Sequence, residues 1–582
     1  MKHKNIFILF IAAALMVLSS CGEDFLYKAP QGSIDQAALA NQTGIDLLTT
    51  STYANITENN WGASLFNWTF GGMYGGDANK GSDPNDQSVL NTMETYNILS
   101  DNGYISEKYQ WVYKGVKRAN IALQTIEITE ELPEDFKNSR IGELHFLRAM
   151  FYFEGIKVFG PFLPWVDEEN TENDPKIHND KDIYSNVLND IDIAINNLPA
   201  KQDLPGRANS WAAKALKAKI LMQKNDLAAA KPILKDVIDN GITSNGLKYE
   251  LEDDMNANFD SFRDNGKESI FAAQFSADYN NANPGMSLCY PHGGEEAGGC
   301  CGFYQPSNEL ANSFKVDANG LPFLDNSYRN TPYVSVVNPT SDDNSNWSIN
   351  NDVPVDPRLD FAIGRFGIPY KDWGFPKNNW VRDVGNGGFF VPKKHVFTKK
   401  ELDAGLAGNG LHNGWAPGSA MNLQYLSLRD VYLLYAECLA NDNDLAGAME
   451  YVNKIRVRAG LEDNIIMNGD APAADYRVSP YPSSHAAFSD KDVCIKAIRM
   501  ERKLELAMEG QRWFDLTRWG GEYMNQQLRD YLDFEKKFIS KFASASVLPA
   551  SKTMFPLPLG QIQTMGNDEN GKPYLEQPAP WK

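Results

Sequence analysis

The chain has 582 residues, of which 42% are hydrophobic, and it carries a formal net charge of −20. This length is enough for a large core divided into more than one lobe. The acidic balance excludes nucleic acid and anionic lipid head groups as partners, because both need compensating Lys and Arg. Many aromatic side chains stand in stretches rich in Gly, Asn and Asp, a pattern that indicates platforms for a neutral, polar ligand.

The first twenty-one residues are typical of a targeting segment. An apolar run from Ile6 to Leu18 follows Lys2 and Lys4, and it is too short for an ordinary membrane-spanning helix. The ending Leu18-Ser19-Ser20-Cys21 resembles a bacterial lipobox, which implies cleavage before Cys21 and acyl chains on that cysteine. Each buried CH₂ of such a chain contributes about 0.8 kcal/mol to anchoring. We therefore expect a signal peptide at 1–20 and a lipidated tether at 21–35; the alternative is a plain secreted protein.

Helical periodicity dominates residues 36–244. Three stripes of apolar residues recur every three or four positions, and each predicts an amphipathic helix. Pro199 is expected to end the helix that carries the third stripe. The stripes are Val112, Val116, Ala119, Leu123 and Ile126; Leu144, Leu147, Phe151 and Val158; and Ile183, Val187, Ile191 and Ile195.

One helical hairpin occurs twice. Residues 212–237 and 430–455 both have the pattern helix, short turn, helix, and the turn Asn225-Asp226-Leu227-Ala228 matches Asn443-Asp444-Leu445-Ala446. The asparagine suits a helix end and the aspartate an N-cap. Each unit is about 34 residues long, the length of a tetratricopeptide repeat. A single hairpin cannot bury its own apolar face, so further units should stack against these two.

Between the two hairpins the composition changes and the helical periodicity is lost. Residues 245–425 are rich in Gly, Asn, Asp, Pro and aromatics, and only Glu268 to Phe275 is typical of a strand. We expect a long, loop-rich insertion there, and a C-terminal helical part at 426–582 that completes the same fold. In that last part, 462–490 is a second loop region, and Ala497, Met500, Leu504 and Ala507 mark another helix. The predicted fold is mostly α, a tetratricopeptide-like scaffold carrying an irregular insertion.

The cysteines give little sign of metal binding. No Cys-x-x-Cys pair occurs, so the usual zinc-ribbon spacing is absent. Cys438 and Cys494 fall in helical patterns and read as small core residues. A disulfide between Cys289 and either Cys300 or Cys301 would close a short loop, and the sequence does not decide whether it forms.

Several blocks along the chain carry a resemblance to a known family. They are Cys21 to Leu26, Asp77 to Gly81, Tyr113 to Asn120, Glu143 to Pro161, Arg499 to Gly520 and Phe555 to Pro558. The strongest runs from Arg499-Met500-Glu501-Arg502 to Asp515-Leu516-Thr517-Arg518-Trp519-Gly520. In this order they resemble the SusD/RagB surface lipoproteins of Gram-negative glycan-uptake systems. The resemblance implies four tetratricopeptide-like units and a non-enzymatic, glycan-binding lid on a SusC-like, TonB-dependent outer-membrane transporter. It also implies a location at the cell surface, with the lipid on Cys21 as the membrane anchor.

In that family the glycan site is commonly formed by loops after the first helices and in the central insertion. Sugar recognition needs flat apolar faces for C–H groups and planar amides or carboxylates for hydroxyls. No aromatic residue lies between Ala78 and Leu90, so a ring supplied from that loop is not expected. Gly-rich flanks would let other rings lie exposed, although a structural role for each ring is an equal alternative. The candidate glycan contacts are Asn79, Asp83, Tyr290, Phe303, Tyr304, Trp373 and Trp380.

The charged block near the C-terminus has two interpretations. Arg502, Glu505, Glu509 and Arg512 are spaced three or four apart, so we expect them to line one helix face as an ion ladder, with Trp513 and Trp519 in the core. The alternative is a catalytic carboxylate pair. His145 is expected to pack between helices, because no second His or Cys stands at metal spacing. Signatures of zinc proteases, serine hydrolases and P-loops are absent.

We therefore predict a binding protein rather than an enzyme, with no cofactor, although a structural calcium ion is left open. Two other hypotheses are a peptide-binding lid on the same type of transporter and a helical glycoside hydrolase, whose carboxylates would leave no short motif.

Overall fold

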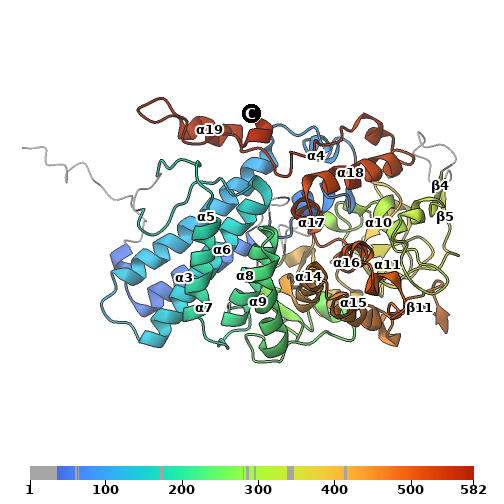
Figure 1. The fold of residues 1–582 in the computed structure, drawn as a ribbon, viewed down its shortest axis with the longest axis horizontal. Coiled ribbons are helices and arrows are strands. Elements are labelled where there is room, and N and C mark those ends of the chain that lie inside the picture. The colour runs from blue at the N-terminus through green and yellow to red at the C-terminus, as the bar shows by residue number, and fades with distance from the viewer. Residues whose placement is uncertain are drawn as a thin grey trace, which may run out of the picture.

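The computed structural model describes residues 36–58, 62, 64–170, 175–278, 281–283, 287–293, 297–336, 347–411 and 416–582. The predicted signal peptide, tether and lipidated Cys21 lie outside these ranges. Helices dominate the described chain and its strands are short, which confirms the mostly α prediction (Figure 1). The long helices are α3 (Gln42–Thr57), α5 (Gly103–Glu127), α6 (Glu134–Phe159), α7 (Tyr184–Asn197), α8 (Ser210–Gln223), α9 (Leu227–Asn240), α14 (Leu428–Asn441), α15 (Leu445–Ala459), α16 (Lys491–Glu505) and α18 (Gly521–Glu535). The shorter ones are α4 (Leu90–Glu94), α10 (Asn308–Ser313), α11 (Arg358–Ala362), α12 (Val384–Gly387), α13 (Lys399–Asp403), α17 (Arg512–Arg518) and α19 (Leu559–Met565).

Among the described residues the strands form two-stranded antiparallel sheets. The predicted strand is present as β2, which pairs with β10 from just before the second hairpin. The pairs are β1 (Ala78–Gly81) with β3 (Phe303–Pro306), β2 (Ser269–Ala273) with β10 (Leu423–Ser427), β4 (Val334–Val336) with β5 (Trp347–Ile349), β6 (Ile363–Gly364) with β7 (Val391–Pro392), β8 (Ala407–Gly408) with β9 (Gly418–Ser419), and β11 (Met467–Asn468) with β12 (Ala471–Pro472).

The helices form one continuous row. Helix α5 packs on α3, and each of α6 to α9 packs on the helix before it in the chain. Helix α9 then packs on α14, which begins only after the whole insertion, and α15 and α16 continue the row (Figure 1). Helices from before and after the insertion therefore pack against each other and form one scaffold.

The repeated hairpin is present in both halves. Asn225 and Asn443 adopt left-handed φ angles of 64° and 65°, and each ends its turn before a helix that starts two residues later. Asp226 Oδ1 accepts the backbone N–H of Ala229 at 3.2 Å, and Asp444 Oδ1 accepts that of Gly447 at 2.9 Å. The predicted turn and both predicted N-caps are thus confirmed.

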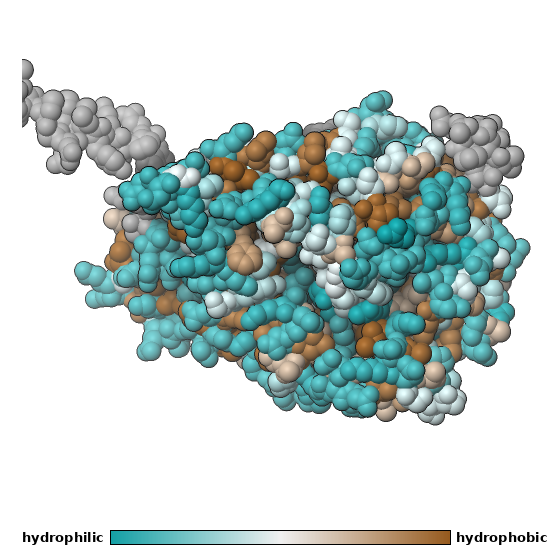
Figure 2. All heavy atoms as spheres, turned by 45° about the horizontal axis from the view of Figure 1, so that its top comes forward, coloured by the Kyte–Doolittle hydropathy of each residue, from teal (hydrophilic) through white to brown (hydrophobic). Residues whose placement is uncertain are grey.

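The predicted stripes lie in α5, α6 and α7 and are buried, apart from Ile195, which is partly buried. Cys438 and Cys494 are buried in helices, as predicted. Outside the core, the face shown in Figure 2 is mostly hydrophilic, with separate hydrophobic side chains among polar ones. In the ranges that the structure describes, no helix combines the length and the apolar character that crossing a bilayer requires.

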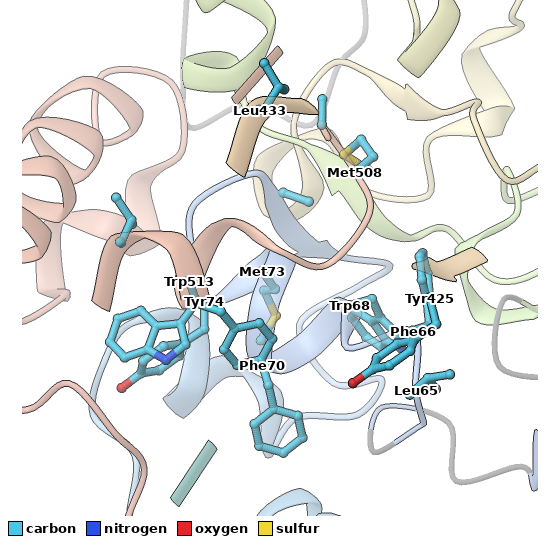
Figure 3. Packing of buried hydrophobic residues seen from close by; sticks show 14 of the residues in the cluster. Leu65, Phe66, Trp68, Phe70, Met73, Tyr74, Tyr425, Leu433, Met508 and Trp513 are labelled. Carbon is cyan, nitrogen blue, oxygen red and sulfur yellow. The ribbon is translucent and has the colours of Figure 1, made fainter. Parts of the chain in front are cut away.

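A π-helical turn, Trp68–Met73, ties the N-terminal part to the C-terminal part. Trp513 of α17 meets Tyr74 edge to face, with ring centroids 4.7 Å apart (Figure 3). A Cβ atom on Gly71 would lie only 1.7 Å from the carbonyl oxygen of Gly510, so this close approach requires glycine. Of the two tryptophans predicted as core, Trp513 is fully buried, whereas Trp519 is only half-buried.

The charged block departs from prediction. Helix α16 ends at Glu505, because Met508 and Gly510 turn the chain with φ angles of 65° and 70°. Arg502 and Glu505 therefore lie on α16, Glu509 lies in the turn, and Arg512 begins α17. The expectation of one shared helix face is wrong. The ion pairs nevertheless form with other partners: Arg502 with Asp515 at 3.0 Å, Glu505 with Arg358 at 3.1 Å and Glu509 with Arg429 at 2.9 Å.

The cysteines of the insertion also differ from expectation. The disulfide joins the neighbours Cys300 and Cys301, and Cys289 is a free, buried thiol. The proposed link from Cys289 to either of them is absent, since those two sulfurs already bond to each other.

Candidate functional site

Three segments that carry candidate residues, around Asn79, Tyr304 and Trp380, converge on β1 and β3. In this two-stranded sheet Asn79 lies opposite Gln305, and Gly81 lies opposite Phe303. The third loop joins them through Asn386 Nδ2, which donates to the carbonyl of Gly81 at 2.7 Å. Segments near 80, 303 and 385 in the sequence are thus held together by backbone and amide hydrogen bonds.

The outer side of this junction is polar. Arg382 donates to Asp83 at 2.5 Å and to Asp86 at 2.7 Å, and also to Ser82 Oγ at 2.8 Å. Asn85 and Asn379 are exposed beside it, and His292 is half-buried. We call this patch, formed by Asp83, Asn85, Asp86, His292, Asn379 and Arg382, the Arg382 surface.

Electrostatics keeps the Arg382 surface charged and ordered. Backbone N–H groups of Asn85 and Asp86, together with Arg382, hold the pKa of Asp83 below its usual range. Burial lowers the pKa of Lys80 to about 8, and its ammonium group donates to the carbonyls of Asp83 and Asp86 at 2.8 and 2.7 Å. Burial, and then the nearby Arg382, lowers the pKa of His292. At neutral pH the patch therefore presents a fixed carboxylate, a guanidinium and a neutral imidazole.

The predicted aromatic platforms lie beneath this surface rather than on it. Tyr290 and Trp380 are 0% exposed, and Phe303 and Tyr304 are 1% exposed. Tyr304 packs against Trp68 with centroids 5.8 Å apart, and Trp380 meets Tyr370 edge to face at 5.0 Å. The expectation that Gly-rich flanks leave these rings exposed is wrong, because the folded chain buries them almost completely. Their role as glycan contacts stays a prediction that this packing disfavours.

The remaining candidates are split. Asn79 is buried, donates to Gly387 at 3.2 Å and accepts the hydroxyl of Tyr531 at 3.2 Å, so it braces the sheet. Asp83 is partly exposed and belongs to the Arg382 surface. Trp373 is half-buried and its indole N–H donates to the carbonyl of Phe397 at 2.9 Å. Of the predicted residues, Asp83 and Trp373 alone keep accessible side-chain surface.

Other predictions concern metals and His145. His145 lies between α6 and α7, with Nδ1 2.8 Å from Asp190 Oδ1, as expected for a helix-packing residue. In the part of the chain that the structure describes, no group of three His, Cys, Asp or Glu side chains is placed to hold a metal ion.

Sequence reasoning missed Asp86, Arg382 and Asn386. Asp86 stands in the same acidic loop as Asp83, a local signal that could have found it. Arg382 and Asn386 lie about three hundred positions further on and belong to no motif. Only the folded chain brings them to Asp83 and Gly81.

Comparison with known proteins agrees with this architecture. A family model described as the SusD family matches residues 267–569, and one described as "Starch-binding associating with outer membrane" matches residues 24–222. A SusD-like protein of Bacteroides ovatus is 22% identical over 564 residues, which are 91% of this chain and 86% of the relative.

Solved structures show the same fold. A SusD-like protein of Bacteroides fragilis aligns with a TM-score of 0.64 and 20% identity, over 95% of this chain and 100% of that one. Surface glycan-binding protein A of Bacteroides thetaiotaomicron, in complex with laminarihexaose, aligns with a TM-score of 0.60 and 17% identity, over 92% and 99%. A further neighbour is solved with a xylogluco-oligosaccharide, at a TM-score of 0.57 and 20% identity, over 83% and 85%.

The predicted class and family are therefore confirmed. SusD-like proteins are glycan-binding proteins and not enzymes, and one matching model describes an association with the outer membrane. The first model alone spans more than half of the chain, and the row of helices agrees with the fold of its solved relatives. This chain belongs to the SusD family.

Proposed function

We propose that this protein captures an oligosaccharide at the cell surface, through the Arg382 surface, and delivers it to a SusC-like, TonB-dependent transporter. Cys21 would carry the lipid that holds it on the outer membrane. The observation that carries the proposal is the convergence of three distant loops on one rigid, polar patch. Relatives with bound laminarihexaose and xylogluco-oligosaccharide support the ligand class.

The chemistry of the Arg382 surface suits hydroxyl groups. Asp83 accepts hydrogen bonds, Arg382 donates them, and the exposed amides of Asn85 and Asn379 can do both. Because Arg382 and the backbone already hold Asp83 in place, a ligand need not order these groups on binding. A saccharide that lacks the matching hydroxyl would leave them unpaired, which gives selectivity.

Replacing Arg382 by Ala tests this site. We expect saccharide binding to weaken by about 1.5–3 kcal/mol, the range for hydrogen bonds to charged groups. Titration calorimetry with laminarihexaose, a xylogluco-oligosaccharide and maltohexaose would measure it. Arg477→Ala is the matched control, because Arg477 forms a similar exposed pair with Asp475 at 2.7 Å, outside the site. Equal affinities in the two variants would remove the Arg382 surface from the binding site.

Delivery is tested in the same preparation. The full-length protein, extracted from membranes with detergent, should copurify with a large β-barrel protein, and a Cys21→Ser variant should leave the membrane fraction. Recovery of the native protein alone, in repeated mild extractions, would contradict the transporter partnership.

A further inference from the structure

A hollow separate from the Arg382 surface lies along the helical scaffold. It has a volume of about 450 Å³ and runs between α5, the loop at 164–170 and α19. In Figure 1, α19 lies above α5. We call it the tyrosine groove, and its defining residues are Tyr109, Tyr113, Lys117, Gln124, Asn170 and Gln561. Its volume falls within the range of small-molecule sites.

The floor of the groove is one face of a single helix. Tyr109, Tyr113, Lys117 and Gln124 recur at helical spacing along α5, so the floor extends for about 22 Å at 1.5 Å per residue. The opposite wall is equally fixed. Lys176 donates to the last carbonyls of α19, those of Thr564 and Met565, at 3.0 and 3.1 Å. The groove is thus built from elements that are held in place without a ligand.

Two neighbouring tyrosine rings form the apolar part of the floor. Tyr109 and Tyr113 lie with centroids 4.6 Å apart and planes inclined by 35°. The hydroxyl of Tyr113 donates to the carbonyl of Pro164 at 2.8 Å, which fixes the ring, and the side chain stays half-buried. A fixed, partly open ring offers a C–H-binding face at little entropic cost.

Within the described part of the molecule, polar side chains with unpaired hydrogen-bonding atoms line the groove beside these tyrosines. Gln124 donates through Nε2 to the carbonyl of Glu168 at 2.8 Å, which orients its Oε1 while leaving that oxygen without a partner in the described chain. Asn170 accepts through Oδ1 from Asp167, and its Nδ2 is unused among the described residues. The side-chain amide of Gln561 and the ammonium of Lys117 likewise have no partner within the described ranges. The groove therefore offers both hydrogen-bond donors and acceptors.

This composition selects a class of ligand. Among the described residues that line the groove there is no Asp or Glu, whereas Lys117 is a cation, so these residues offer a cationic ligand no counter-charge. An acyl chain would cover several amides without pairing them, which is unfavourable. A saccharide fits this lining better, because a C–H face can lie on the half-buried ring of Tyr113, next to Tyr109, which is 7% exposed, while its hydroxyls pair with the amides. We propose that the tyrosine groove is a second saccharide-binding site, separate from the Arg382 surface; this extends the proposed glycan-binding function and rests on it.

The chain offers a matched pair of variants on α19. Gln561 faces the groove, whereas Gln563, two residues further on, is exposed outside it. Both can be changed to Ala in the full-length protein without breaking a side-chain hydrogen bond between described residues. We expect Gln561→Ala to weaken groove binding about 3- to 10-fold, the loss of one hydrogen bond, and Gln563→Ala to leave it unchanged.

The measurement uses an Arg382→Ala background, in which binding at the Arg382 surface is weakened and the contribution of the groove is easier to resolve. Laminarihexaose, a xylogluco-oligosaccharide and maltohexaose are titrated into Arg382→Ala, Arg382→Ala/Gln561→Ala and Arg382→Ala/Gln563→Ala. Residual binding that Gln561→Ala alone weakens supports the groove. If Arg382→Ala abolishes binding, or both glutamine variants behave alike, the groove proposal is wrong while the proposed function stands. If the unmodified protein binds no saccharide but binds peptides, both proposals are wrong.

Discussion

At the scale of single residues, the partners of a buried carboxylate decide the direction in which its pKa shifts. Burial alone would raise the pKa of Glu505, but Arg458, Arg358 and Arg429 outweigh it and lower the pKa to about 2. Glu535 is equally buried, and its partners are the Asn308 amide at 3.0 Å and the backbone N–H of Glu309 at 2.6 Å. Burial therefore prevails and raises its pKa to about 7. At neutral pH the same kind of side chain is therefore fully ionised in one place and only about half ionised in the other.

Glu535 gives a pH prediction with a definite sign. Between an unfolded pKa near 4.3 and the folded value of about 7, the folded state holds a proton that the unfolded state has lost. The free energy of unfolding therefore falls as pH rises through this window. Glu535→Gln cannot titrate, so its stability relative to the native protein should rise by about 2–3 kcal/mol between pH 5 and pH 8. The Asn308 amide can turn to accept from the new amide.

Chemical denaturation of both proteins at pH 5 and pH 8 measures this difference. Since every other titrating group is shared, the comparison isolates Glu535. A difference in unfolding free energy that is the same at both pH values would show that Glu535 is already ionised in the folded protein.

At the scale of elements, the two helical hairpins have the same turn between their helices. Each uses a left-handed asparagine to end the first helix and an aspartate to begin the second. Both helices then bury an apolar face against the next element in the row. The sequence alone determines the turn, because the interactions involved span three or four residues.

Removing either aspartate cap should weaken its helix. We expect Asp226→Ala and Asp444→Ala each to cost about 1 kcal/mol and to speed amide exchange in the first turn of α9 or α15, respectively. Hydrogen exchange followed by mass spectrometry resolves these turns. Asp239→Ala is the control, since Asp239 lies in the last turn of α9 and its pair with Lys235 is exposed. Exchange that rises equally in all three variants would show that the caps have no special role.

At the scale of the whole molecule, buried ion pairs connect the insertion to the C-terminal part of the scaffold. Arg429 of α14 bonds Glu268, next to β2, at 3.2 Å, and Glu509, after α16, at 2.9 Å. Arg458 of α15 bonds the same Glu268 at 3.1 Å and also Glu505. These groups are almost fully buried, so the loss of one partner leaves charge in a poor solvent for it.

Arg429→Met should therefore destabilise the entire fold by about 3–5 kcal/mol. Because the network joins the insertion to the C-terminal helices, and α14 packs on α9 of the N-terminal part, we expect one cooperative transition at lower denaturant concentration, measured by circular dichroism and by tryptophan fluorescence. Arg477→Met, in an exposed pair, should cost less than about 1 kcal/mol. Similar losses in the two variants, or separate transitions by the two probes, would contradict this role.

The sequence by itself determined the helical scaffold, the repeated hairpin with its caps, the strand at β2 and the family. These depend on periodicity and on contacts a few residues apart, which are visible in a linear chain. The tertiary structure decided the site. Composition placed Tyr290, Tyr304 and Trp380 in open loops, yet other loops bury them, and Arg382 meets Asp83 across nearly three hundred residues. Burial in an irregular segment depends on which distant segment folds over it, and no local pattern records that choice.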